Sequence, residues 1–497
     1  MSGTVSPGNV KISDYFIAAL SLIAITSYLP FAVAALLSEK LAAYHVTIGL
    51  IVSLVYLSMA IGSGLSGVFT GLGLIVGPAV GVALIVSQTS AKVISIQGLL
   101  VSTFLAGVIA FFISIPWRGP GESFRAKFLR KLPPAAKVGV RGGIGGFLAS
   151  TAIRPYEEMA SDLSKYHKVI ALFVAFVIIL LLAEILQRYA LSNTHWFSKS
   201  ISERKRNLVI LVLRSVSFVV PVSFFLILYR LNVFQQPPSI LPHISIGWPP
   251  PVPMFDADGW ASGNPFDIVA KIMIFLVIIL FVFITDIPGS PFDILESRLA
   301  DERDVAAKTI VDKSFMVTSL MVIINPLLSL FTSVYYAENH VALSGDSAHD
   351  AINKPIPSYL CAGFFLICSG AFLFVDFPVV EMRRWLLVAV SPALFCLGVT
   401  LTARALQRDD ELESRATMGP AKSYFVPVSL TLILTHTIGF ELALPLGICY
   451  YYLDRMTLDR ATGDNDSVPS DGWLDGVFLA SAIIALLLGL IRLGFAE

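Results

Sequence analysis

Long apolar runs recur from one end of the chain to the other, and they constrain its fold more than any other feature. A run of about 20 apolar residues is long enough to cross a bilayer as a helix, which satisfies its own backbone hydrogen bonds in lipid. Of the 497 residues, 56% are hydrophobic and 14% are charged, whereas soluble domains carry about 25% charged residues. The sequence therefore predicts an all-α polytopic membrane protein embedded in a lipid bilayer.

Fourteen segments are apolar enough to be candidate spans. They lie near residues 15–38, 45–70, 71–87, 96–116, 137–152, 167–187, 207–230, 266–286, 305–324, 325–343, 356–376, 384–405, 423–452 and 473–495. Segments 71–87 and 325–343 are too short, or too interrupted by Gly and Pro, to be ordinary spans. They are the third members of the first seven and of the second seven segments.

These interrupted segments occupy matching places, which indicates an internal repeat. Pro78 and Pro326 lie about 250 residues apart, and nearly the same interval separates Gly143 from Pro392 in the two fifth segments. Because seven is odd, the two repeats must be inverted relative to each other in the membrane. Paired interrupted segments indicate the binding site of a transporter. The alternative is two unrelated Gly/Pro kinks in ordinary helices.

Two carboxylates, Asp286 and Glu338, lie next to such interruptions, one beside Pro288 and the other after Asn325. A charge near the bilayer centre costs about 2.5–3.5 kcal/mol. Irregular backbone at that depth is tolerated only where it is buried in protein or lines a wet cavity. The pair therefore predicts a substrate and proton site. The alternatives are a solvated segment end for Glu338 and a helix cap or turn for Asp286.

The distribution of basic residues predicts the orientation. Loops 117–137 and 188–206 are rich in Lys and Arg, whereas residues 231–270 contain neither. By the positive-inside rule the first two loops are cytoplasmic and the third is outside. With fourteen spans, both termini are then expected on the cytoplasmic side of the cell membrane.

Other classes of function find little support in the sequence. The formal net charge is zero, which gives no reason to expect nucleic acid as a partner. The four cysteines lie in apolar runs without zinc-ligand spacing, and the chain has no P-loop, HExxH, GxSxG, haem or redox motif. We therefore expect no metal, no cofactor and no enzyme activity, and we regard a membrane enzyme or a non-transporting scaffold as distant alternatives.

Six short motifs resemble the nucleobase–cation symporters, in the adenine/guanine/hypoxanthine permease branch. The similarity is weak per residue but runs in order from about Tyr15 to Phe495. The motifs are PAVGVAL (78–84), GIGGFLA (143–149), TDIPGS (285–290), TSVYYAEN (332–339), SPALFCLG (391–398) and THTIGFE (435–441).

The resemblance implies a fold of seven plus seven inverted segments, in which the third and tenth are half-helices with a short strand. It also implies a core domain that carries the substrate and a gate domain that rocks against it. The expected division is 1–136 core, 137–230 gate, 231–264 extracytoplasmic loop, 265–376 core and 377–497 gate.

The resemblance also implies the residues of the site. Glu338 and Asp286 are the expected proton-coupling residues. The family's binding-site asparagine is replaced here by Ala83, and the methionine before it by Val80. The expected substrate-binding residues are Glu338, Thr332, Ser333, Val80, Gly81 and Ala83.

Taken together, these features predict a secondary active transporter, a symporter that couples protons to a purine nucleobase or a similar small planar solute. The resemblance also implies a possible homodimer. The alternative is an anion transporter or exchanger of the sulfate-permease type, which shares the architecture. Such proteins usually carry a soluble regulatory domain after the last span, and this chain is expected to lack one, since it stops at Glu497.

Overall fold

The computed structural model describes the chain from Ile12 to Glu413 with gaps, together with a few later residues. The described residues are 12–42, 44, 46–88, 94–117, 119–120, 123–131, 134–160, 163–191, 203–230, 252, 265–285, 291–295, 304–336, 339, 354–374, 379–413, 446, 449, 480, 483, 484 and 487. The predicted residues Asp286 and Glu338 lie outside this set. So do nearly all of the loop 231–264 and of the segments 423–452 and 473–495.

Helices account for most of the described chain, and two three-residue strands interrupt them. The helices of the first half are α1 (Ile12–Thr26), α2 (Leu29–Ala42), α3 (Ile48–Thr70), α4 (Val80–Gln88), α5 (Ile96–Ser114), α6 (Phe124–Lys131), α7 (Pro134–Ala160), α8 (Leu163–Leu191) and α10 (Glu203–Arg230). Those of the second half are α12 (Pro265–Thr285), α13 (Pro291–Ile294), α15 (Val305–Leu327), α18 (Ile356–Phe372) and α19 (Val379–Glu413). The strands are β1 (Val76–Pro78) and β2 (Ser333–Tyr335).

Within the described residues, seven stretches of helix are long and apolar enough to cross a membrane. The chain is therefore a multi-pass membrane protein, as the apolar runs predict. Helices α8 and α10 are only 22% and 28% buried over their apolar windows. Their outer faces carry large exposed apolar side chains, which is typical of surfaces that contact lipid.

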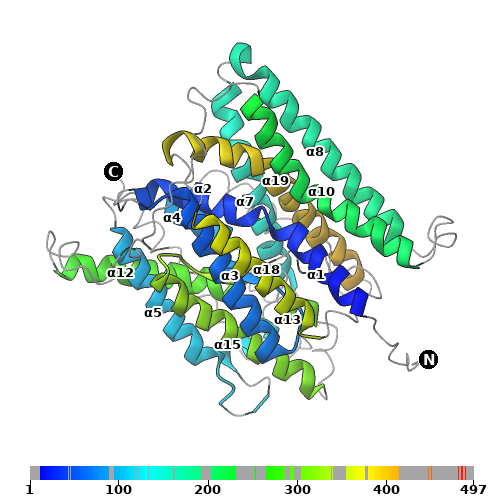
Figure 1. Cartoon of the computed structure of the whole chain (residues 1–497). Coiled ribbons are helices and arrows are strands. Elements are labelled where there is room, and N and C mark those ends of the chain that lie inside the picture. The colour runs from blue at the N-terminus through cyan, green and yellow to red at the C-terminus, as the bar shows by residue number, and fades with distance from the viewer. Residues whose placement is uncertain are drawn as a thin grey trace, which may run out of the picture.

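The helices form two packed groups (Figure 1). In one group α3 packs on α18, and α5 packs on both α12 and α15. In the other, α19 packs on α7, α8 and α10. The pair α1 and α2 lies between the groups, where α1 contacts α10 and α18 while α2 contacts α3 and α19.

Small residues let the helices approach closely where they cross. A Cβ on Gly145 of α7 would lie 2.5 Å from the carbonyl oxygen of Gly398 in α19. A Cβ on Gly107 of α5 would lie 2.9 Å from the backbone nitrogen of Ile323 in α15. Lipid gives no hydrophobic drive between helices, so such backbone contact is a main source of their association.

The helix boundaries differ from the predicted ones in several places, and α7 and α19 both run beyond the predicted segments 137–152 and 384–405. The first predicted span is broken between α1 and α2, and the basic loop 117–137 contains the short helix α6. The tenth segment was expected to begin at Asn325, but α15 continues through Pro326 to Leu327. Leu328 caps the helix and Ser329 then takes a φ of 57°, so the helix ends just after Pro326, as expected after a proline.

Candidate functional site

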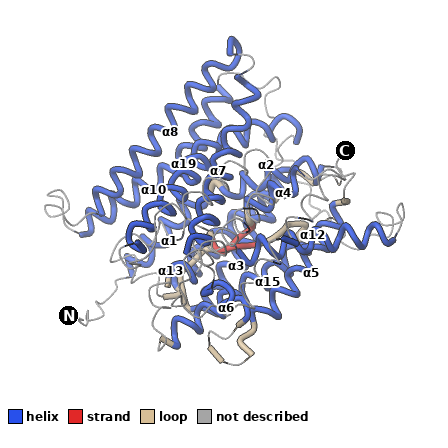
Figure 2. Tube along the Cα trace, turned by 180° about the vertical axis from the view of Figure 1, so that it is seen from behind, coloured by secondary structure: helices blue, strands red, loops and turns tan. Residues whose placement is uncertain are grey.

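The two strands meet in the middle of the molecule, where they are drawn in red in Figure 2. They pair antiparallel, with Gly77 opposite Val334 at the centre of the register. Two further backbone hydrogen bonds extend the pair. The amide of Ala79 donates to the carbonyl oxygen of Thr332 at 2.8 Å, and that of Tyr336 donates to the carbonyl oxygen of Ile75 at 3.3 Å. Short strand segments thus take the place of helix in both predicted interrupted segments.

Gly77 makes this close crossing possible. A Cβ at this position would collide with the hydroxyl of Tyr336 and would lie 2.6 Å from Cγ of Met59 in α3. The Tyr336 hydroxyl also donates a 3.2 Å hydrogen bond to the carbonyl oxygen of Pro78. A glycine is therefore required at position 77 by the packing of β1 against α3 and Tyr336.

Asn325 anchors β2 to its surroundings. Its side-chain amide donates to the carbonyl oxygen of Phe331 at 2.6 Å and to Oγ of Ser333 at 2.8 Å. Its side-chain oxygen accepts from the hydroxyl of Ser58 in α3 at 2.7 Å. The Asn325 side chain is fully buried, so this set of bonds satisfies a polar group at membrane depth.

Asn339 likewise anchors the backbone of Ile75, the residue just before β1. Its side-chain oxygen accepts from the amide of Ile75 at 3.0 Å, and its side-chain nitrogen donates to the Ile75 carbonyl oxygen at 2.9 Å. The side chain thus pairs with Ile75 as a neighbouring strand would. The predicted site residues included neither Asn325 nor Asn339. A side-chain amide within an apolar run, near a Pro/Gly interruption, is a usable signal for such anchors.

Helix α4 begins at Val80, directly after β1, in the interior of the protein. The first N–H groups of a helix have no partner within the helix, and its N-terminus carries about half a positive charge. Thr332 lies next to this N-terminus through its bond to Ala79. Its side chain is 1% exposed, and its hydroxyl has no hydrogen-bond partner among the described residues. Thr332, with its buried hydroxyl, is thus tied to the point where β1 passes into α4.

The structure brings together the predicted residues that it describes. Val80 and Gly81 form the first turn of α4, and Ala83 follows them in the same helix. Thr332 and Ser333 stand at the start of β2. Ser333 uses its Oγ as an acceptor for Asn325 and therefore also has a structural role. Within the described part of the chain, no group of three or more His, Cys, Asp or Glu is placed to hold a metal ion.

No protein-family model matches this sequence, and no curated protein matches it. The fold is similar to that of the transmembrane domain of a cyanobacterium bicarbonate transporter, BicA. The two align with a TM-score of 0.50 and 13% identity over 88% of this chain and 97% of that chain. The chain therefore shares that fold.

Two structures of another transporter also align. The overall structure of SLC26A9 gives a TM-score of 0.48 at 13% identity, over 90% of this chain and 66% of that one. The murine Solute Carrier 26 family member A9 anion transporter, in its inward-facing state, gives a TM-score of 0.49 at 12% identity. That alignment covers 91% of this chain and 69% of the other chain.

The resemblance to nucleobase–cation symporters is wrong, since the solved structure whose fold this chain shares is the transmembrane domain of a bicarbonate transporter. Two of the motifs that carried it have a different explanation. GIGGFLA contains Gly145 and SPALFCLG contains Gly398, and these two glycines meet where α7 and α19 cross. Gly145 and Gly398 in these two motifs thus serve close helix packing, which is a property of the architecture and not of the substrate.

Proposed function

We propose that this protein is a secondary transporter of a small inorganic anion, such as bicarbonate, and not an enzyme. The anion binds where β1 and β2 cross, in front of the N-terminus of α4. One observation carries the proposal: Thr332, whose buried hydroxyl has no hydrogen-bond partner among the described residues, is bonded through its backbone carbonyl to Ala79, the residue just before α4. The fold shared with a bicarbonate transporter's transmembrane domain supports it.

The hydrogen-bond donors at the strand crossing suit an anion that must be released again after it binds. Backbone N–H groups at a helix N-terminus bind negative charge without contributing a full positive charge. A hydrogen bond to a charged group contributes about 1.5–3 kcal/mol, so the Thr332 hydroxyl strengthens binding without making it irreversible. A planar oxyanion can accept from the first turn of α4 and from this hydroxyl together.

Matching helix contacts support the proposed inverted repeat. When the predicted segments of the two halves are matched in chain order, α1 corresponds to α12, α3 to α15 and α5 to α18. The contact of α3 with α18 then corresponds to that of α15 with α5, and the contact of α1 with α18 corresponds to that of α12 with α5. In this scheme residues 1–136 and 265–376 form the core that carries the anion, and residues 137–230 and 377–497 form the gate.

The remaining parts of the scheme are proposals from the sequence. Both termini are cytoplasmic, the protein resides in the cell membrane, and a homodimer is the proposed assembly. Asp286 and Glu338 exchange protons with the site. Both residues lie outside the described part of the chain.

Uptake into liposomes that contain the purified full-length protein tests the function. The panel consists of radiolabelled bicarbonate, sulfate, chloride, adenine and uracil, each measured with and without a proton gradient. We expect saturable uptake of at least one anion and no uptake of the nucleobases. Nucleobase uptake without anion uptake would overturn the proposal.

A further inference from the structure

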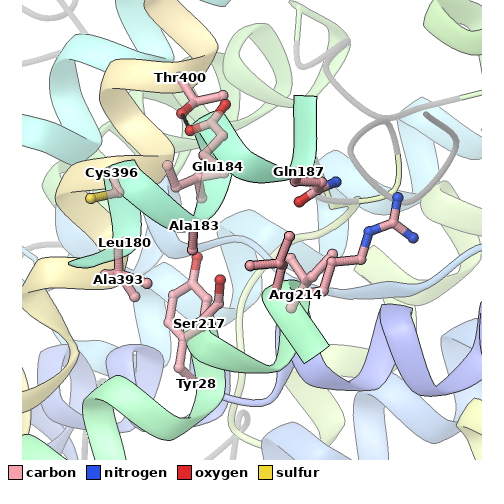
Figure 3. Close-up of a pocket in the computed structure, with 13 residues that line it drawn as sticks. Tyr28, Leu180, Ala183, Glu184, Gln187, Arg214, Ser217, Ala393, Cys396 and Thr400 are labelled. Atoms are coloured by element: carbon pink, nitrogen blue, oxygen red, sulfur yellow. Dashed lines mark hydrogen bonds between the residues drawn. The ribbon is translucent and has the colours of Figure 1, made fainter. Parts of the chain in front are cut away.

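Most buried hydroxyl groups of the described residues have a hydrogen-bond partner within the protein. In the pocket of Figure 3, the hydroxyl of Thr400 in α19 donates a 2.5 Å hydrogen bond to Glu184 of α8. The hydroxyl of Ser314 donates within its own helix α15, to the carbonyl oxygen of Val311 at 2.7 Å. Such bonds are expected, because a buried polar group without a partner costs free energy. Ser329 departs from this pattern.

The Ser329 hydroxyl lies in the link between α15 and β2, residues 328–332, and it has no hydrogen-bond partner among the described residues. The side chain is 1% exposed. Thr332, at the other end of the same link, is equally buried, and its hydroxyl also lacks a partner within the described part of the chain. Two buried donors that no described protein group satisfies thus occur within four residues.

The backbone of Ser329 is strained as well. Its φ of 57° makes it the only residue other than glycine with a positive φ in the described part of the chain. In this left-handed conformation a Cβ lies too close to the following carbonyl oxygen, a clash that glycine avoids. In the proposed inverted repeat α15 corresponds to α3, and α3 is capped by Gly71, whose φ is 72°, shortly before β1. A serine therefore stands where its counterpart is a glycine.

The residues on either side of Ser329 are both tied to Asn325. The carbonyl oxygen of Asn325 accepts from the amide of Leu328 at 2.8 Å and from the amide of Leu330 at 2.9 Å. These bonds hold the link in a turn and keep Ser329 in its strained conformation. Residues three positions apart are separated by at most about 10 Å, even in extended chain. A polyatomic anion with one bound water can bridge such a span between Ser329 and Thr332.

We propose that Ser329 is a second substrate-binding residue, whose hydroxyl donates a hydrogen bond to the transported oxyanion or to a water bound to it. This proposal rests on the proposed function, because its ligand is the anion that Thr332 binds. Hydrogen bonds to charged groups are stronger than those between neutral groups. The bound anion therefore offsets the cost of the strained backbone and of the buried hydroxyl. Serine at this position lowers the stability of the anion-free protein and raises its affinity for the anion.

The variant Ser329→Gly tests this opposition between stability and affinity. Without anion, it should have a higher Tm than the wild type, because both the strain and the unsatisfied hydroxyl are removed. In liposomes, its KM for the transported anion should rise about tenfold. A serine with a structural role alone cannot give a higher Tm together with a higher KM. An unchanged KM, or a Tm below that of the wild type, overturns the proposal.

Two further variants separate the hydroxyl from the backbone. Ser329→Ala removes the hydroxyl but keeps a Cβ in the left-handed conformation, so it should share the raised KM and have a lower Tm than Ser329→Gly. The matched control is Ser314→Ala, where a fully buried hydroxyl bonds its own helix, and it should keep the wild-type KM. An equal rise of KM in the control overturns the proposal.

The same measurements distinguish failure of this inference from failure of the proposed function. Anion uptake by the wild type with the same KM in the Ser329 variants removes Ser329 from the site and leaves the transport function standing. Absence of uptake of every anion by the wild type overturns the transport function, and with it the assigned ligand of Ser329.

Discussion

The backbone amide of Ala79 donates a 2.8 Å hydrogen bond to the carbonyl oxygen of Thr332, two residues that lie in opposite halves of the chain. This bond fixes the start of α4 against the start of β2. Thr332 is 1% exposed and α4 begins at the buried Val80, so both ends of this bond lie in the protein interior. The proposed anion site depends on this relationship, and the predictions below test its parts.

Replacing Thr332 with Val should weaken anion binding while the fold survives, because the two side chains have nearly the same shape. Loss of one hydrogen bond to a charged ligand raises the KM for the transported anion about tenfold or more. Kinetics of uptake into liposomes measure the change. The control is Thr103→Val in α5, where the buried hydroxyl bonds only its own helix at Leu99. Equal KM values for the two variants would remove Thr332 from the site.

Gly77→Ala should abolish uptake and lower stability by about 1–3 kcal/mol, because the new methyl group has no room between Met59 and Tyr336. The measurement is uptake combined with thermal unfolding in detergent. Gly363→Ala in α18 is the matched control, since a Cβ there has no neighbour within 4 Å. Wild-type uptake by Gly77→Ala would show that the strands do not need this close crossing.

Asn325→Leu should destabilise the protein by about 3 kcal/mol, because Ser58 and Ser333 lose buried hydrogen-bond partners. A fall in Tm of roughly 5 °C is expected. The Ser58→Ala variant removes one of these bonds and should cost about 1 kcal/mol. In the double variant Ser58→Ala with Asn325→Leu, the two losses should be less than additive, because the residues share a bond. Full additivity of the two stability losses would contradict the role of Asn325 as the anchor of β2.

Gly145→Val should separate α7 from α19, because the backbone of Gly398 and the side chain of Thr402 occupy the space that Val needs. We expect poor assembly and a lower Tm, measured by size-exclusion chromatography and thermal unfolding. Gly370→Val in α18 is the control, since a Cβ there meets nothing within 4 Å. A Gly145→Val variant as stable as the control would contradict the close approach of α7 to α19.

The sequence could predict the membrane-spanning helices, because their limits depend on the length of apolar runs. The spans α3 and α5 begin and end close to their predicted limits, since long apolar runs have one stable conformation in lipid. The interrupted segments could also be found, because Gly and Pro mark them directly. Helix α6 was not predicted, since a basic eight-residue helix in a loop leaves no apolar run to detect.

Contacts between distant parts of the chain could not be predicted. The pairing of Asn339 with Ile75 joins residues that are 264 positions apart, and no local pattern specifies it. The hydrogen bond from Thr400 in α19 to Glu184 in α8 joins residues 216 positions apart, and no local pattern specifies it either. The substrate family was predicted wrongly, and two of the glycines in its motifs, Gly145 and Gly398, serve helix packing.

The most direct test of the central claim is an experimental structure of the protein saturated with the anion that the uptake panel selects. We expect density for the anion within hydrogen-bond distance of the first-turn N–H groups of α4 and of the Thr332 hydroxyl, at about 3 Å. Anion density found only elsewhere, with the strand crossing filled by protein side chains, would contradict it.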